Sequence, residues 1–170
     1  ENAIIVGNKN HRTLLERQLS EVNQKSFDII LEPLSKNTAP SLTIACMKIL
    51  KDYGDSLVLV LPADHAISDL KKFQDDIYRG HKFAKDGSIV LFGIEPKAPE
   101  TRFGYIKIES NTNLSQNVIQ VEDFIEKPNL ESAELFIKSA NYYWNSGILM
   151  LRASIWIDLI RYFNIFKVIL

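Results

Sequence analysis

The sequence has one cysteine and no apolar run long enough to cross a membrane. Cys46 has no partner for a disulfide within the chain, which favours a reducing compartment. The longest apolar run, residues 57–61, is far shorter than the roughly 20 residues of a membrane-spanning helix. The N-terminus also lacks the layout of a signal peptide. The sequence therefore predicts a soluble, cytoplasmic protein with no membrane partner.

Charge is balanced, and several catalytic signatures are missing. The 20 basic and 21 acidic residues are scattered and give a net charge of -1, so nucleic acid is not an expected partner. The histidines and the cysteine show no spacing typical of zinc ligands. There is no serine nucleophile elbow and no G-x-G-x-x-G loop, which makes a dinucleotide-dependent oxidoreductase the least expected class.

Hydrophobic residues make up 46% of the chain, and they form short apolar runs that alternate with longer amphipathic stretches. The runs predict strands and the stretches predict helices, in the order strand 4–6, helix 11–22, strand 29–31, helix 40–53, strand 57–61, helix 70–85 and strand 89–94. Because crossover helices cover strands that are apolar throughout, this alternation predicts an α/β fold with an open, mostly parallel sheet and helices on both faces.

The pattern changes after Gly93. Residues 104–109 and 118–125 are two strand-like runs joined by a polar segment, which predicts an antiparallel excursion from the sheet. The remaining predicted elements are a helix over residues 130–140, a strand over 148–151 and a helix beginning near Ser154. The apolar tail, residues 163–170, predicts that the fold continues beyond it.

Asp64 follows a strand that is predicted to be central in the sheet. In open α/β sheets ligands bind beyond the carboxyl ends of the strands, so a carboxylate at this place is a candidate site residue. Mg²⁺ binds one or two protein carboxylates together with water and substrate phosphates, and Asp64 suits that chemistry. Alternatively, Asp64 caps the next helix and His65 is a surface residue.

Glu32 and Pro33 end another predicted strand, and a helix start follows them. Asn37 or Thr38, followed by Pro40, is typical of a capped helix N-terminus. Free amides at such an N-terminus also suit an anionic or nucleotide ligand. Both interpretations stay open on the residues alone.

Two further polar clusters lie at strand ends. The carboxylate of Glu126 accepts hydroxyl hydrogen bonds and the ammonium of Lys127 pairs with anions, so together they suit a sugar phosphate, although they could equally be solvated. Residues 144–147 form either a turn with an aromatic anchor or a place where Asn145 and the nearby backbone meet sugar hydroxyls.

Five motifs therefore occur in a fixed order: Glu32-Pro33 with Asn37-Thr38-Ala39-Pro40, Pro62-Ala63-Asp64-His65, Phe103-Gly104-Tyr105-Ile106, Phe124-Ile125-Glu126-Lys127-Pro128 and Trp144-Asn145-Ser146-Gly147. The series resembles bacterial mannose-1-phosphate guanylyltransferases over residues 4–156, including those that also carry a phosphomannose isomerase domain. The resemblance implies a Rossmann-like nucleotide-diphospho-sugar transferase fold. It also implies that mannose 1-phosphate attacks the α-phosphorus of GTP with the help of Mg²⁺, giving pyrophosphate and GDP-mannose for polysaccharide biosynthesis.

The same resemblance assigns roles to individual residues. The guanine and ribose side is implied to be lined by Glu32, Pro33, Asn37, Thr38 and Ala39. Asp64 is implied to hold the metal and Lys127 to bind the sugar phosphate, and these two are the expected catalytic residues. The residues expected to contact mannose are Gly104, Tyr105, Glu126, Asn145 and Gly147. The number of subunits is not implied, and a homo-oligomer stays open.

The chain departs from the family pattern in three places. The glycine-rich loop that cradles the triphosphate would precede Glu1, and a second metal-binding aspartate has no counterpart before Leu170. Residues 1–170 are thus expected to be a partial nucleotidyltransferase domain that is inactive alone. Arg102 stands where the family more often has glycine, next to the sugar motif. The alternatives are a sugar nucleotidyltransferase with another base or hexose, and a non-catalytic domain that binds sugar nucleotides.

Overall fold

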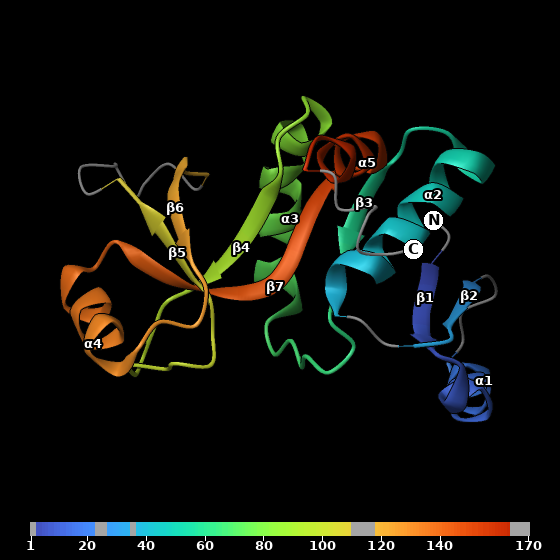
Figure 1. The fold of residues 1–170 in the computed structure, drawn as a ribbon, viewed down its shortest axis with the longest axis horizontal. Coiled ribbons are helices and arrows are strands. Elements are labelled where there is room, and N and C mark those ends of the chain that lie inside the picture. The colour runs from blue at the N-terminus through green and yellow to red at the C-terminus, as the bar shows by residue number, and fades with distance from the viewer. Residues whose placement is uncertain (1–2, 23–26, 35–36, 110–117, 164–170) are drawn as a thin grey trace. The chain divides into compact units, whose positions relative to one another are not determined.

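A computed structural model describes residues 3–22, 27–34, 37–109 and 118–163 (Figure 1). The chain divides into two compact units, which we call the terminal unit (Glu1–Ser56 with Ala153–Leu170) and the central unit (Leu57–Arg152). The elements in chain order are β1 (Ala3–Asn8), η1 (Lys9–His11), α1 (Arg12–Glu21), β2 (Phe27–Glu32), α2 (Thr38–Tyr53), β3 (Leu57–Val60), α3 (Leu70–Lys85), β4 (Val90–Ile94), β5 (Tyr105–Ile108), β6 (Val121–Ile125), α4 (Leu130–Ser139), β7 (Tyr142–Arg152) and α5 (Ala153–Tyr162). The predicted alternation of helices and strands is confirmed.

In the terminal unit, β1 and β2 form a parallel pair from Ala3 opposite Phe27 to Asn8 opposite Glu32. Helices α1 and α2 contact β1, and α2 also packs against α5. The buried residues of α2 recur every three or four positions, which places them on one face of the helix: Leu42, Thr43, Ala45, Cys46 and Ile49.

Two side chains join α2 to α5. The Trp156 indole Nε1 donates to Thr43 Oγ1 at 2.9 Å, and the same hydroxyl donates to the Ala39 carbonyl at 2.7 Å. Cys46, on the same buried face of α2, has no exposed surface. Burial raises the pKa of its thiol to about 12.

In the central unit, β7 is the common partner of three strands. It pairs antiparallel with β3, β4 and β5, and β5 in turn pairs antiparallel with β6. Trp144 of β7 pairs with both Ile94 of β4 and Tyr105 of β5, so β4 and β5 lie on opposite edges of β7. Met150 pairs with both β4 and β3, which puts β3 on the same edge as β5.

The expectation of a mostly parallel sheet does not hold among the described residues, where only β1 and β2 pair in parallel. Strands β3 and β4 do run in the same direction, as parallel strands would, but β7 lies between them and runs the opposite way. Within the described pairings β3 has β7 as its one partner and is not central. The antiparallel excursion is confirmed by β5 and β6, whereas the predicted loop between them lies outside the described residues.

The helices of the central unit cover β7. Helix α3 packs against β4 and β7, and α4 against β7 (Figure 1). The Phe136 ring of α4 stacks on Tyr142, with ring centroids 4.1 Å apart. Asp69 caps α3 by accepting from the Lys72 amide, and Asn129 caps α4 by accepting from the Ser132 amide, each at 2.9 Å. In the part of the chain that the structure describes, every helix is too short or too polar to span a membrane.

Candidate functional site

Several predicted site residues of the central unit meet at one end of its strands. The Asn145 amide donates to the Gly104 carbonyl at 2.7 Å, and the Lys127 amide donates to the Phe103 carbonyl at 3.2 Å. A Cβ atom on Gly147 would lie 3.3 Å from Pro62, the residue two positions before Asp64. We call this group the strand-end cluster; its members are Pro62, Phe103, Gly104, Glu126, Lys127, Asn145 and Gly147. The fold thus brings together segments that lie far apart in the sequence.

Gly104 lets a carboxylate lie directly against the backbone. A Cβ atom at this position would be 2.8 Å from Glu126 Oε2 and 2.7 Å from Phe124 Cζ, so any larger residue would displace these atoms. The Lys127 ammonium lies 3.4 Å from Glu126 Oε1, and the two side chains are 65% and 59% exposed. A carboxylate and an ammonium are therefore both open to a ligand at this place.

Lys127 has a left-handed backbone, with φ of 47°. Such a conformation destabilises non-glycine residues, typically by about 1–3 kcal/mol at functional sites, and Pro128 restricts Lys127 further. The hydrogen bond from the Lys127 amide to Phe103 helps to hold it there. In this conformation the Lys127 side chain, just after the end of β6, lies next to that of Glu126.

Asn145 and Gly147 lie inside β7, where the sequence predicted a turn before the strand. Gly147 has a φ of 74°, which favours glycine, and its amide donates to Asn145 Oδ1 at 3.2 Å. This bond occupies the side-chain oxygen of Asn145. The side-chain Nδ2 group is then the part of Asn145 that can donate a hydrogen bond to a ligand.

Tyr105 is placed differently from the other predicted sugar contacts. Its side chain has no exposed surface and packs against Phe136 of α4, with ring centroids 5.3 Å apart. Among the described residues, its hydroxyl and the Nε1 group of Trp144 are buried without a hydrogen-bond partner. The Phe103 and Trp144 rings pack edge to face, with ring centroids 5.4 Å apart. In this conformation Tyr105 supports the cluster from within the core.

Asp64 is 88% exposed, and its nearest ionic partner is His65 Nε2 at 4.0 Å. The alternative that Asp64 caps the next helix is wrong, because Asp69 performs that role. Among the described residues no group of three or more histidine, cysteine or acidic side chains surrounds a metal position. Mg²⁺ does not need one, since it keeps several waters and uses substrate phosphates, so the open carboxylate of Asp64 fits this ion.

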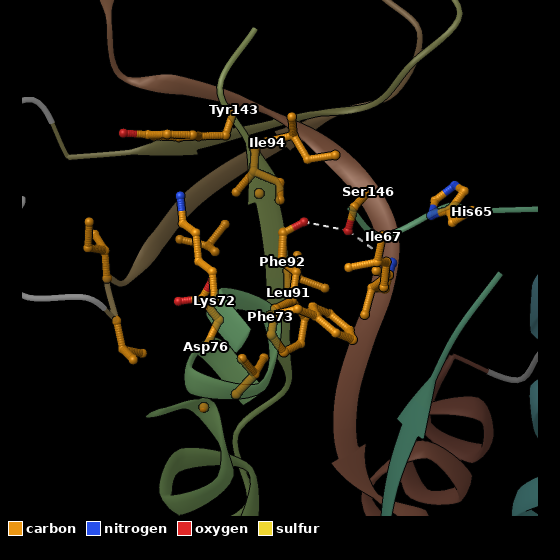
Figure 2. A pocket seen from close by; sticks show the side chains of 18 of the residues that line it. His65, Ile67, Lys72, Phe73, Asp76, Leu91, Phe92, Ile94, Tyr143 and Ser146 are labelled. Carbon is orange, nitrogen blue, oxygen red and sulfur yellow. Dashed lines mark hydrogen bonds between the residues drawn. The ribbon is translucent and has the colours of Figure 1, made fainter. Parts of the chain in front are cut away.

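A cavity of about 1120 Å³ lies beside Asp64 in the central unit, between α3, β4 and the β5–β6 region (Figure 2). In Figure 2 His65 and Lys72 lie on opposite sides of it, with Phe92 and Ser146 between them. Of the predicted site residues, all of which the structure describes, Asp64 alone lines this cavity. No member of the strand-end cluster lines it.

The predicted nucleotide side lies in the terminal unit. Glu32 is only 6% exposed, and Ser41 Oγ of α2 donates to its Oε1 at 2.8 Å. Helix α2 begins at Thr38, two residues before the predicted start at Pro40, with Asn37 in the capping position, but the Asn37 side chain accepts no hydrogen bond from the helix. Pro33, Asn37 and Thr38 are exposed, and Ala39 is partly buried. Among these residues, Glu32 therefore has a supporting position, and the others are open to a ligand.

An ion pair that the sequence did not predict precedes Gly104. The Arg102 guanidinium donates to both carboxylate oxygens of Glu100, at 3.0 and 2.6 Å, and the Arg102 amide also donates to this carboxylate. These bonds lower the pKa of Glu100 to about 2. In the sequence Arg102 is recognisable only as a departure from the family pattern, and its spacing of two residues from Glu100 is no familiar motif.

Comparison with known proteins identifies the family. Residues 1–161 match the family described as "Nucleotidyl transferase". The chain belongs to this family. A mannose-1-phosphate guanylyltransferase of Salmonella montevideo is 43% identical over 159 residues, which cover 91% of this chain and 33% of that protein. The alginate biosynthesis protein AlgA of Pseudomonas aeruginosa is 41% identical over 155 residues, which cover 91% of this chain and 32% of that protein.

The fold of this nucleotidyl transferase chain also recurs in a solved structure. A mannose-6-phosphate isomerase from Helicobacter pylori matches with a TM-score of 0.78 and 36% identity, over 91% of this chain and 58% of that one. The α/β nucleotidyltransferase fold is therefore established for the chain. The chain spans about a third of the length of the curated relatives it matches.

Proposed function

We propose that this chain carries the sugar side of a mannose-1-phosphate guanylyltransferase, which makes GDP-mannose and pyrophosphate from GTP and mannose 1-phosphate. The observation that carries the proposal is the strand-end cluster, where Glu126 lies against Gly104 with Lys127 and Asn145 beside it. The guanylyltransferase relative from Salmonella montevideo supports the choice of substrates. The AlgA relative supports a role in polysaccharide biosynthesis.

Each group of the cluster has a defined task in this proposal. The Glu126 carboxylate accepts hydrogen bonds from sugar hydroxyls, and Asn145 Nδ2 donates to a sugar oxygen. The Lys127 ammonium pairs with the phosphate of the sugar. A phosphate oxygen then attacks the α-phosphorus of GTP, a new P–O bond forms there, and the bond to the β-phosphate breaks to release pyrophosphate. Catalysis by positioning and charge neutralisation requires no covalent intermediate.

The nucleotide side of the proposal rests on the terminal unit. Pro33, Asn37, Thr38 and Ala39 contact guanine and ribose, while Glu32 anchors the segment through Ser41. Asp64 would hold Mg²⁺, which neutralises the developing charge on the phosphates when it is bound. Because the family match covers both units, we treat residues 1–170 as part of one nucleotidyltransferase domain. A Rossmann-like arrangement with helices on both faces of the sheet stays a prediction for that domain.

A substrate comparison tests the function. Protein expressed from the complete gene is supplied with Mg²⁺, with mannose 1-phosphate or glucose 1-phosphate, and with GTP, ATP or UTP, and pyrophosphate release is followed. We expect the fastest release with GTP and mannose 1-phosphate. A clear preference for UTP or ATP, or for glucose 1-phosphate, would overturn the assignment in favour of a related sugar nucleotidyltransferase.

Calorimetry separates an enzyme from a binding domain. If the same protein binds GDP-mannose but releases no pyrophosphate with any pair of substrates, it is a non-catalytic binding domain and the proposal fails. Turnover that stops when Mg²⁺ is chelated, and returns when the metal is restored, supports the proposed requirement for Mg²⁺.

A further inference from the structure

Strand β7 bulges opposite a single residue of β4. Leu91 pairs with Leu149 and Gly93 pairs with Asn145, so Phe92 alone faces the three residues from Ser146 to Ile148. A bulge bends its strand and re-aims the side chains beside it, and bulges are common next to active sites. This bulge includes Gly147 and directly follows Asn145, both of which belong to the strand-end cluster.

The hydroxyl of Ser146 closes the bulge. It donates to the Phe92 carbonyl at 2.6 Å and accepts from the Ile148 amide at 3.1 Å (Figure 2). These are the backbone groups that the interrupted ladder between β4 and β7 would otherwise leave unpaired. Ser146 is only 8% exposed, so a missing hydroxyl would not be replaced freely by bulk water.

The closed bulge determines the conformation of the two neighbouring site residues. With Ser146 and Ile148 held, Gly147 lies in its left-handed conformation, and its amide reaches Asn145 Oδ1. The Asn145 amide is tied in turn to the Gly104 carbonyl. Ser146 itself lines the cavity beside α3, whereas Asn145 and Gly147 do not.

We propose that Ser146 is a positioning residue for sugar recognition, which acts through Asn145 and Gly147 without touching the substrate. The inference rests on the proposed function, because it assumes that the strand-end cluster binds the sugar phosphate. It concerns the affinity for one substrate only. The nucleotide is predicted to bind through other residues.

Two variants and a matched control test the inference in the full protein. Ser146→Ala removes the hydroxyl, whereas Ser146→Thr keeps it and can place its extra methyl group toward the cavity that Ser146 lines. Ser88→Ala makes the same chemical change at another residue lining that cavity, with no bond to the bulge. The KM values for mannose 1-phosphate and GTP, kcat, and amide hydrogen exchange at Gly147 and Ile148 are measured.

For Ser146→Ala we expect the KM for mannose 1-phosphate to rise about tenfold, which corresponds to about 1.4 kcal/mol, while the KM for GTP changes less than about twofold. Amide hydrogen exchange at Ile148 should accelerate in Ser146→Ala. In Ser146→Thr both the KM for mannose 1-phosphate and the exchange rate should return to the wild-type values. Ser88→Ala should resemble the wild type. An unchanged KM for the sugar phosphate, or equal rises for both substrates, would overturn the positioning role.

The two proposals fail in different ways. If the wild-type protein prefers another nucleotide or hexose phosphate, the proposed function fails. The role of Ser146 is then decided by measuring the KM values of the same variants for the preferred nucleotide and the preferred sugar phosphate. If the wild-type protein neither binds nor turns over any sugar phosphate, the positioning proposal is overturned as well.

Discussion

Gly104 is the position where one added methyl group has the largest predicted effect on substrate binding. In Gly104→Ala the new Cβ would press on Glu126 Oε2 and Phe124 Cζ. Both are ends of flexible side chains that can move, so we expect the unfolding free energy to fall by no more than about 1 kcal/mol. Displacing the carboxylate should raise the KM for mannose 1-phosphate about tenfold or more, which steady-state kinetics would measure.

Gly54→Ala is the control for Gly104→Ala. Gly54 has a φ of 75°, and no atom lies within 4 Å of the place that a Cβ would take, so alanine there strains the backbone without a clash. It should lower stability by about 1–3 kcal/mol and leave the KM unchanged. A wild-type KM in Gly104→Ala would show that the Glu126 carboxylate does not meet the sugar.

Lys127 illustrates a conflict between stability and binding. Its left-handed backbone favours glycine, so Lys127→Gly should be more stable than Lys127→Ala by about 1 kcal/mol in urea unfolding. Both variants lack the ammonium and should lose affinity for the sugar phosphate to a similar extent. Equal stabilities would indicate that Lys127 leaves the left-handed region in solution.

At the scale of elements, the contact between α2 and α5 depends on one buried hydroxyl. Thr43→Val keeps the shape but leaves the Trp156 indole N–H without its acceptor, which should lower the unfolding free energy by about 1–3 kcal/mol. In the Trp156→Phe background the same change should be nearly neutral, because no donor is left unpaired. Equal losses in both backgrounds would mean that this hydrogen bond does not stabilise the pair of helices.

Cys46 also lies on the buried face of α2. The folded state holds the thiol proton up to a pKa of about 12, whereas an exposed thiol has a pKa near 9.0. The unfolded chain therefore releases this proton first, and the thiol's contribution to stability falls as the pH rises from about 9 to 12, by up to about 1.4 kcal/mol per pH unit. Cys46→Ala should flatten the stability curve in this range relative to the wild type; parallel curves would contradict the burial.

Local patterns predicted the elements better than they predicted the sheet. Apolar periodicity located β1 to β4 and α1 to α4 to within a few residues, because it reports which face of each element is buried. It could not show that β7 inserts between β3 and β4, since that pairing joins strands far apart in the sequence. Ser146 was quoted within a motif, but no role was predicted for its hydroxyl, for the same reason. Its partner, the Phe92 carbonyl, is recognisable only once the register of β4 and β7 is known.

For the whole molecule, the candidate residues divide between the two units. The predicted sugar-side residues lie in the central unit and the predicted nucleotide-side residues in the terminal unit. Glu126→Gln should therefore raise the KM for mannose 1-phosphate about tenfold with little change for GTP, and Thr38→Ala should do the reverse to a smaller extent. Glu131→Gln on the exposed surface of α4 is the control. Initial-rate kinetics in which both substrates are varied would measure these effects, and a rise in the wrong KM would refute the division.

The position of β7 in the chain constrains how the protein folds while it is being synthesised. In the described pairings β3, β4 and β5 all bond to β7, which the ribosome makes after all three. A nascent chain that has emerged from the ribosome as far as Asn141 can pair β5 with β6, but the edges of β3 and β4 must wait until residues 142–152 have emerged. Unpaired strand edges are prone to aggregate. A pause in translation before residues 142–152 have emerged would therefore expose these edges for longest, at the stage when the growing chain most needs a chaperone.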